Sequence, residues 1–129
     1  MAVNSTNSIV QTTLTAPTIL YSINAQTGTS YTAVSTDAAS FVTMTNAASN
    51  IFYIPTNASV PFAIGTTLNV FCNGDGLTTI QAVTSGTTTI RSVSGNGGVT
   101  TAPVLRQKYS GASCIKIDTD VWAIIGDVY

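Results

Sequence analysis

Charge is what this sequence has least of. Asp, Glu, Lys and Arg make up 7% of its 129 residues, whereas an ordinary soluble domain carries about 25%. There is no Glu and no His, so the side chains that most often act as general bases are largely missing. The charged residues are Asp37, Asp75, Asp118, Asp120, Asp127, Arg91, Arg106, Lys108 and Lys116.

The low charge has two interpretations. A free monomer usually stays soluble by covering itself with mixed charge, and a neutral β-protein would have to use Thr, Ser and Asn instead. Alternatively, much of the surface is buried in an assembly, because charged residues are depleted in the cores of interfaces. The net charge of −1 argues against a nucleic-acid partner, since phosphate binding requires a basic face.

Cysteine is also scarce. Cys72 and Cys114 are too few for a disulfide framework, and their spacing matches no metal-binding pattern. We therefore expect free, partly buried thiols and no cofactor. No apolar stretch reaches the roughly 18 residues of a membrane span, and no secretory signal pattern is present, so we expect no membrane partner.

Short apolar runs bounded by turn residues dominate the rest of the chain. Thr favours strands and Ser favours turns and caps. Many short strands at this spacing are typical of a sandwich or barrel, so we predict an all-β fold, an antiparallel β-sandwich or barrel. A single helical turn is expected at 36–41, capped by Thr36 or Asp37. The predicted strands are 19–23, 29–34, 41–45, 51–54, 66–72, 78–83, 87–93, 102–110, 112–117 and 121–125.

The alternation of apolar and polar residues predicts which side chains share one face of a strand. Leu68, Val70 and Cys72 point one way, and in 112–117 the isoleucines oppose Cys114 and Lys116. The run 121–125 is apolar on both faces. It is either a central strand or a strand whose outer face meets a partner chain.

The chain divides into an N-terminal arm, residues 1–18, and a single β-domain, residues 19–129. The arm is polar and uncharged and ends near Pro17. It is either a flexible terminus or a segment that adds a strand to a neighbouring chain.

Two polar sequences could hold ligands. Asp118-Thr119-Asp120 has the Asp-x-Asp pattern of cation sites, but it lies between two strand-like runs, and Asp and Thr suit tight turns. Asn73-Gly74-Asp75-Gly76 lacks the further ligands of a calcium loop and the Lys of a phosphate loop. We interpret the first sequence as the tip of a β-hairpin. We interpret the second as a hairpin turn whose glycines supply positive φ.

The sequence offers few side chains that could act in catalysis. Cys72 has no neighbouring base, no Gly-x-Ser-x-Gly is present, and a Ser–Lys pair through Lys108 or Lys116 has no support from spacing. We expect no enzyme and assign no catalytic, cofactor-binding or metal residues. The remaining candidate is a sugar-binding groove, because aromatic rings stack on pyranose faces; it would use Tyr21, Tyr31, Tyr53, Tyr109 and Trp122.

Residues 41–129 resemble a small β-domain that recurs in tailed-phage virion proteins, at tail-fibre ends and as short stand-alone proteins. The resemblance rests on Phe62 to Val70 (FAIGTTLNV), on the glycine turn at 73–76, and on Lys108 to Asp127 with Trp122 and Gly126-Asp127 in register. It depends on turns and apolar positions and carries no catalytic residue.

The resemblance implies a structural role in a phage particle. A tail fibre normally has a long shaft and an anchoring region, for which 129 residues leave no space. A stand-alone β-domain with an arm is similar to a capsid decoration (cement) protein, which commonly forms homotrimers on the head and binds the major capsid protein. We therefore expect a location on the capsid surface of the virion. The alternative is a tail-fibre or receptor-binding tip that recognises host-surface glycans.

Overall fold

The protein consists of two stacked β-sheets. The computed structural model describes residues 20–94 and 102–129, so the predicted arm lies outside the described residues. The six-stranded sheet has the order β1-β3-β5-β8-β9-β7, and the three-stranded sheet has the order β2-β4-β6. The elements are β1 (Ser22–Gln26), β2 (Ser30–Thr32), a 3-10 helix (Ser35–Ala39), β3 (Ser40–Met44), β4 (Asn50–Ile54), β5 (Thr67–Cys72), β6 (Thr78–Ala82), β7 (Thr89–Arg91), β8 (Gly111–Asp118) and β9 (Val121–Gly126).

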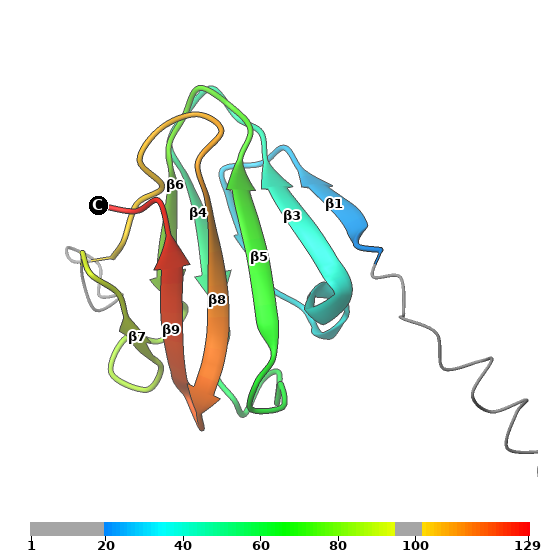
Figure 1. Ribbon diagram of the computed structural model, residues 1–129, viewed down its shortest axis with the longest axis vertical. Helices are drawn as coiled ribbons and strands as arrows, with labels where there is room; N and C mark the ends of the chain where they lie inside the picture. The colour runs from blue at the N-terminus through cyan, green and yellow to red at the C-terminus, as the bar shows by residue number, and fades with distance from the viewer. Residues whose placement is uncertain (1–19, 95–101) are drawn as a thin grey trace, which may run out of the picture.

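The first six strands form three stacked coils. Each coil contributes one strand to each sheet, as β1–β2, β3–β4 and β5–β6, and strands of successive coils pair in parallel. The second and third coils are in register over their whole length, because partners lie 28 residues apart in both sheets: Phe41 pairs with Asn69, and Asn50 with Thr78. This arrangement is a short two-sheeted β-solenoid (Figure 1).

A hairpin interrupts the solenoid after the third coil. Strands β8 and β9 pair antiparallel with each other, and β8 pairs antiparallel with β5. The short strand β7 pairs in parallel with β9. The hairpin therefore lies between β5 and β7, although β7 comes before it in the chain (Figure 1).

The prediction of an all-β fold is confirmed, but antiparallel pairing is wrong for five of the seven strand pairs in the described residues. The chain crosses to the other sheet after each of the first six strands. It therefore returns to a given sheet in the same direction each time, which makes the neighbours parallel. The turn residues in this region mark corners between the sheets.

The glycine sequence at 73–76 is such a corner, and its prediction as a hairpin turn is wrong. It joins β5 to β6, which lie in different sheets. Gly74 and Gly76 do not have positive φ. They are required because the corner of the previous coil lies directly against them: a Cβ on Gly76 would be 1.9 Å from the carbonyl oxygen of Ala48. The absence of a side chain thus lets successive corners stack.

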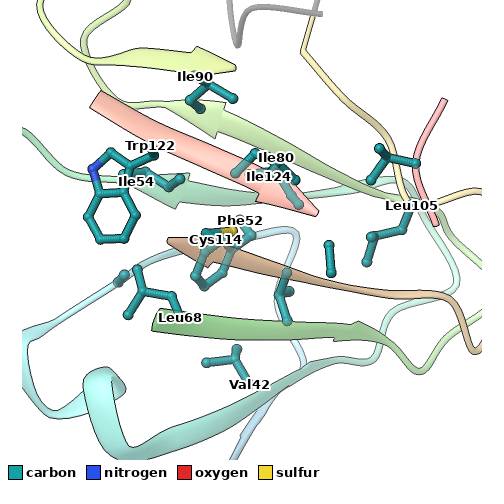
Figure 2. Close-up of a cluster of buried hydrophobic side chains, with 14 of the residues drawn as sticks. Val42, Phe52, Ile54, Leu68, Ile80, Ile90, Leu105, Cys114, Trp122 and Ile124 are labelled. Carbon is teal, nitrogen blue, oxygen red and sulfur yellow. The ribbon is translucent and has the colours of Figure 1, made fainter. Parts of the chain in front are cut away.

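The core lies between the two sheets and consists mainly of apolar side chains (Figure 2). Several polar side chains, among them Asp37, Asn50 and Lys116, are buried as well. Leu68, Val70 and Cys72 are buried, as the alternation predicted. Trp122 is buried from β9, and its ring meets that of Phe62 edge-on with centroids 5.7 Å apart. Burial of side chains this large supplies most of the favourable free energy of folding, at about 25 cal/mol per Å² of apolar area.

Two local predictions had different outcomes. The helical turn is present and begins one residue early, as the 3-10 helix Ser35–Ala39. The predicted cap at Thr36 or Asp37 is wrong, because Val34 is the N-cap residue; Asp37 lies at the third helical position, and its carboxylate accepts the backbone N–H of Val34 at 2.8 Å. The predicted strand 102–110 is wrong. That segment has only isolated bridges, from Val104 to Thr79 and from Leu105 to Val128.

Candidate interaction surfaces

Asp118-Thr119-Asp120 lies at the turn between β8 and β9, so the hairpin-tip interpretation is confirmed. Asp118 Oδ1 accepts the backbone N–H of Thr119 at 2.7 Å. Asp120 has a φ of 54°, and its Oδ1 accepts the N–H of Asn57 at 2.7 Å and the hydroxyl of Thr88 at 3.2 Å. Within residues 20–94 and 102–129, no cluster of three His, Cys, Asp or Glu side chains could hold a metal ion.

The side chains that sequence reasoning considered for catalysis are buried or paired. Cys72 and Cys114 are both free and buried. Burial raises the pKa of Cys114 to about 12, which suppresses the reactive thiolate. The Lys108 Nζ lies 3.0 Å from Asp75 Oδ1 on the surface. The hydrogen bond to Asp75 raises the pKa of Lys108.

Lys116 is the one basic side chain in the described chain that is buried, with 2% of its surface exposed. Strand β8 turns it inward beside Cys114, so the face that carries the isoleucines is the outer one. The Lys116 Nζ donates to Asn57 Oδ1 and to the carbonyl oxygen of Phe62, the latter at 2.7 Å. Neither partner is an acid, so this ammonium group is held by neutral oxygens.

A second buried polar group fills the inside of the first coil. The Asp37 carboxylate is 1% exposed. It accepts the Tyr31 hydroxyl at 2.6 Å and the Asn24 side-chain amide at 2.9 Å. Burial, and next the hydrogen bond to Asp37, raise the pKa of Tyr31 to about 12. The sequence alone does not predict this network, because its members come from three separate elements.

The remaining charged side chains gather at the two ends of the strands. At one end, Arg106 Nε lies 2.8 Å from Asp127 Oδ1, close to the Lys108–Asp75 pair. The hydrogen bonds from Ser110 and then from Arg106 lower the pKa of Asp127. At the other end are the acids of the β8–β9 turn. The broad faces of the sheets are left almost without charge.

The scarcity of charge is clearest on the outer face of the six-stranded sheet, here called the front face. The strand register and the burial pattern place on it side chains that are almost all apolar or neutral; the charged ones are Arg91 on the edge strand β7 and Asp118 at the end of β8, which pairs with Val121. Ile23 and Ile125 are exposed to 66% and 63%. The front face consists of Ile23, Ala25, Phe41, Thr43, Thr67, Asn69, Phe71, Thr89, Arg91, Gly111, Ser113, Ile115, Asp118, Val121, Ala123 and Ile125.

An aromatic row crosses one end of the front face. The ring of Phe71 lies 5.7 Å from that of Phe41 and 6.2 Å from that of Tyr109, measured between centroids. Tyr109 is the one member of the predicted sugar-binding set that belongs to this row. Trp122 is in the core, and Tyr31 packs on Phe52.

The other two members of that set lie elsewhere. Tyr21 precedes β1 and is about half exposed, while Tyr53 lies on the outer face of β4 in the three-stranded sheet. The five aromatic side chains of the predicted set therefore do not line one groove. The outer face of the three-stranded sheet, like the front face, has neutral residues on its strands: Ser30, Thr32, Ile51, Tyr53, Thr79 and Gln81.

The two ends of the solenoid differ in how their edges are covered. Beside β6, Ile80 N–H donates to Pro103 O and Leu105 N–H donates to Thr78 O, each at 2.8 Å. Residues 127–129 in turn pair with this segment through Val104 and Tyr129. At the opposite end, β1 and β2 have no further strand beside them within the described residues.

Comparison with protein-family models and with curated proteins gave no match for this chain. In the part of the chain that the structure describes, no helix is long and apolar enough to cross a membrane.

Proposed function

We propose that this chain is a structural protein of a tailed-phage virion, a capsid decoration (cement) protein that binds the shell of major capsid protein. The observation that carries the proposal is the separation of charge from the broad faces. Apart from Arg91, the charged residues are buried, at strand ends or in end loops, while the strands present Thr, Ser, Asn and aliphatic side chains outward. This composition is typical of surfaces that become buried in assemblies.

Such a role depends on the apolar area that each copy buries and on the number of copies bound. A neutral face loses little charge solvation when it is covered, so burial of its apolar atoms contributes about 25 cal/mol per Å². Opening of a shell would re-expose that area at every copy. Binding to the closed form alone therefore stabilises it by mass action. We propose association as a homotrimer in this role, with no catalytic step.

A second candidate is a tail-fibre or receptor-binding tip. Among the described residues, the edge beside β6 is covered and the edge at β1 and β2 has no further strand, which favours it, because a tip needs a closed end and an end that continues into other structure. The exposed aromatic ring of Tyr109 beside Phe71 offers a stacking surface for a glycan.

The test uses purified particles and two matched variants. Ile125→Lys places a charge on the front face, whereas Ile64→Lys places one in the loop between β4 and β5. The two isoleucines are 63% and 62% exposed, so both variants should fold. We expect Ile125→Lys to reduce the protein retained on sedimented heads at least tenfold, while Ile64→Lys binds like the parent. Equal binding of both variants would exclude the front face as the contact surface.

Copy number separates the two functions. Quantitative mass spectrometry of virions should find hundreds of copies for a head protein and a few dozen or fewer for a tail tip. Absence from the particle would refute both. Binding of the purified protein to a glycan array, lost in Tyr109→Ala, would favour the tip.

A further inference from the structure

The contact between the buried Lys116 and the half-buried Asn57 joins an amine to a carboxamide. The Lys116 Nζ lies 2.5 Å from Asn57 Oδ1. A carbonyl bond is about 1.2 Å long, so the carboxamide carbon, Cγ, lies within about 3.7 Å of the amine nitrogen. Reacting atoms in a near-attack arrangement are about 3–3.5 Å apart. The amine is therefore close to the distance from which it could attack Cγ.

The surroundings keep both groups in place. A second hydrogen bond, from Nζ to the carbonyl oxygen of Phe62 at 2.7 Å, orients the amine. The backbone N–H of Asn57 donates to Asp120 Oδ1 at 2.7 Å, which fixes the loop that carries the carboxamide. Asp120 is thus a positioning residue, itself held in the left-handed turn between β8 and β9.

Water is excluded from the lysine side of the contact. Lys116 is 2% exposed, and its partner across the β8–β9 pairing is the buried Trp122. The Phe62 ring packs edge-on against Trp122. An ammonium group in such a place is poorly solvated, whereas the Asn57 carboxamide is half-buried. Neutral oxygens are its hydrogen-bond partners.

We propose that Lys116 and Asn57 form an intramolecular isopeptide bond in the folded protein. The Nζ–Cγ bond forms and the Cγ–Nδ2 bond breaks. The side-chain nitrogen of Asn57 leaves with the protons that the lysine ammonium gives up, as an ammonium ion. Atoms and charge balance without an oxidant, a reductant or a metal. The buried positive charge is removed, and the protein becomes one unit more negative.

The bond would tie β8 to the loop between β4 and β5. That loop is the long connection from the second coil to the third, and Asn57 and Lys116 lie far apart in the sequence. A covalent link between them would restrict the unfolded chain as a long-range disulfide does. It would do so in a protein whose two cysteines are both free.

Intact-mass spectrometry of the full-length protein tests the proposal. We expect a mass lower than that of the sequence by one ammonia, about 17 Da. Protease digestion should yield a branched peptide that contains both Lys116 and Asn57. Lys116→Met and Asn57→Ala should restore the full mass expected for each variant, while Lys108→Met, the control at an exposed lysine, should keep the loss.

Two results would overturn the bond. One is a parent protein with the full mass of its sequence, which would mean that the contact is only a hydrogen bond. The other is an ammonia loss that persists in Lys116→Met, since an asparagine such as Asn73 before Gly74 can also lose ammonia by closing on its own backbone. The branched peptide from the parent protein decides the matter even if a variant fails to fold.

Discussion

Gly76 provides the sharpest test of the stacked-coil architecture. In Gly76→Ala, the new Cβ would lie 1.9 Å from Ala48 O, 2.2 Å from Ala48 C and 2.8 Å from Ser49 N. All three are backbone atoms, so no side chain can rotate away. Ordinary contact begins near 3.4 Å, and the two corners would have to separate by about 1.5 Å.

That movement would break local hydrogen bonds as well. The Gly76 N–H donates to Asn46 O at 2.9 Å, and the buried Asn50 side chain donates to Gly76 O at 3.2 Å. Overpacking costs about 1–3 kcal/mol, and each lost hydrogen bond about 1 kcal/mol. We therefore expect Gly76→Ala to lower the free energy of unfolding by about 3–5 kcal/mol, a large part of the roughly 5–15 kcal/mol of a typical domain.

Gly28→Ala is the matched control, because Gly28 lies in the equivalent corner of the first coil. The nearest atom to its added Cβ is Ser30 O at 3.7 Å, an ordinary contact. This variant should be neutral or more stable by about 0.4–1 kcal/mol, since alanine restricts the unfolded chain. Guanidinium unfolding followed by the fluorescence of the single Trp122 measures both variants. If the two differ by less than about 1 kcal/mol, the stacking of the corners is wrong.

Two further predictions concern buried titratable groups. Tyr31, whose pKa is raised from 10.0 to about 12, should ionise well above pH 10 in an alkaline absorbance titration. Its contribution to stability is complete below pH 10 and is lost as the pH rises toward 12, because the unfolded chain ionises first. Asp37→Asn should shift this titration downward, and simultaneous ionisation of all tyrosines near pH 10 would contradict the network. Cys72 and Cys114 should not react with a thiol reagent in the folded protein, and both should react in guanidinium. Rapid modification under native conditions would show that the core is open.

The features that depend on neighbouring residues could be predicted from the sequence. The buried face of β5 follows from the alternation of Leu68, Val70 and Cys72. The hairpin tip at Asp118 to Asp120 follows from short polar side chains between two apolar runs. Both results come from periodicity and turn chemistry, which act over a few residues.

The parallel pairing required long-range information. Glycine and asparagine occur both in hairpin turns and in the corners of a solenoid. The local sequence of Asn73 to Gly76 therefore does not distinguish a hairpin turn from a corner. The sequence does contain one long-range signal. The apolar runs of β5 and β6 follow those of β3 and β4 by the same 28 residues, which places Asn46 above Gly74 and Phe52 above Ile80. A search for internal repeats of this length would have favoured stacked coils.

The sequence predicts that the candidate surfaces carry little charge, but it does not predict which residues form them. Scarcity of charge predicted neutral faces, yet only the fold shows that Arg106, Asp127 and the Lys108–Asp75 pair lie together at one end. The inward direction of Lys116 runs against the local pattern, in which Ile115 and Ile117 are the more apolar face. Tertiary partners from the loop at 57–62 reverse that preference.

The position of the β8–β9 hairpin determines the order in which the six-stranded sheet can assemble. Coils one to three pair with neighbours that are already synthesised, so they can stack as the chain emerges. Strand β7 differs, because its partner in the six-stranded sheet, β9, is made some thirty residues later. The pairing of β7 with β9 is therefore a late, non-local step, of the kind that limits the folding rate in proteins with high contact order.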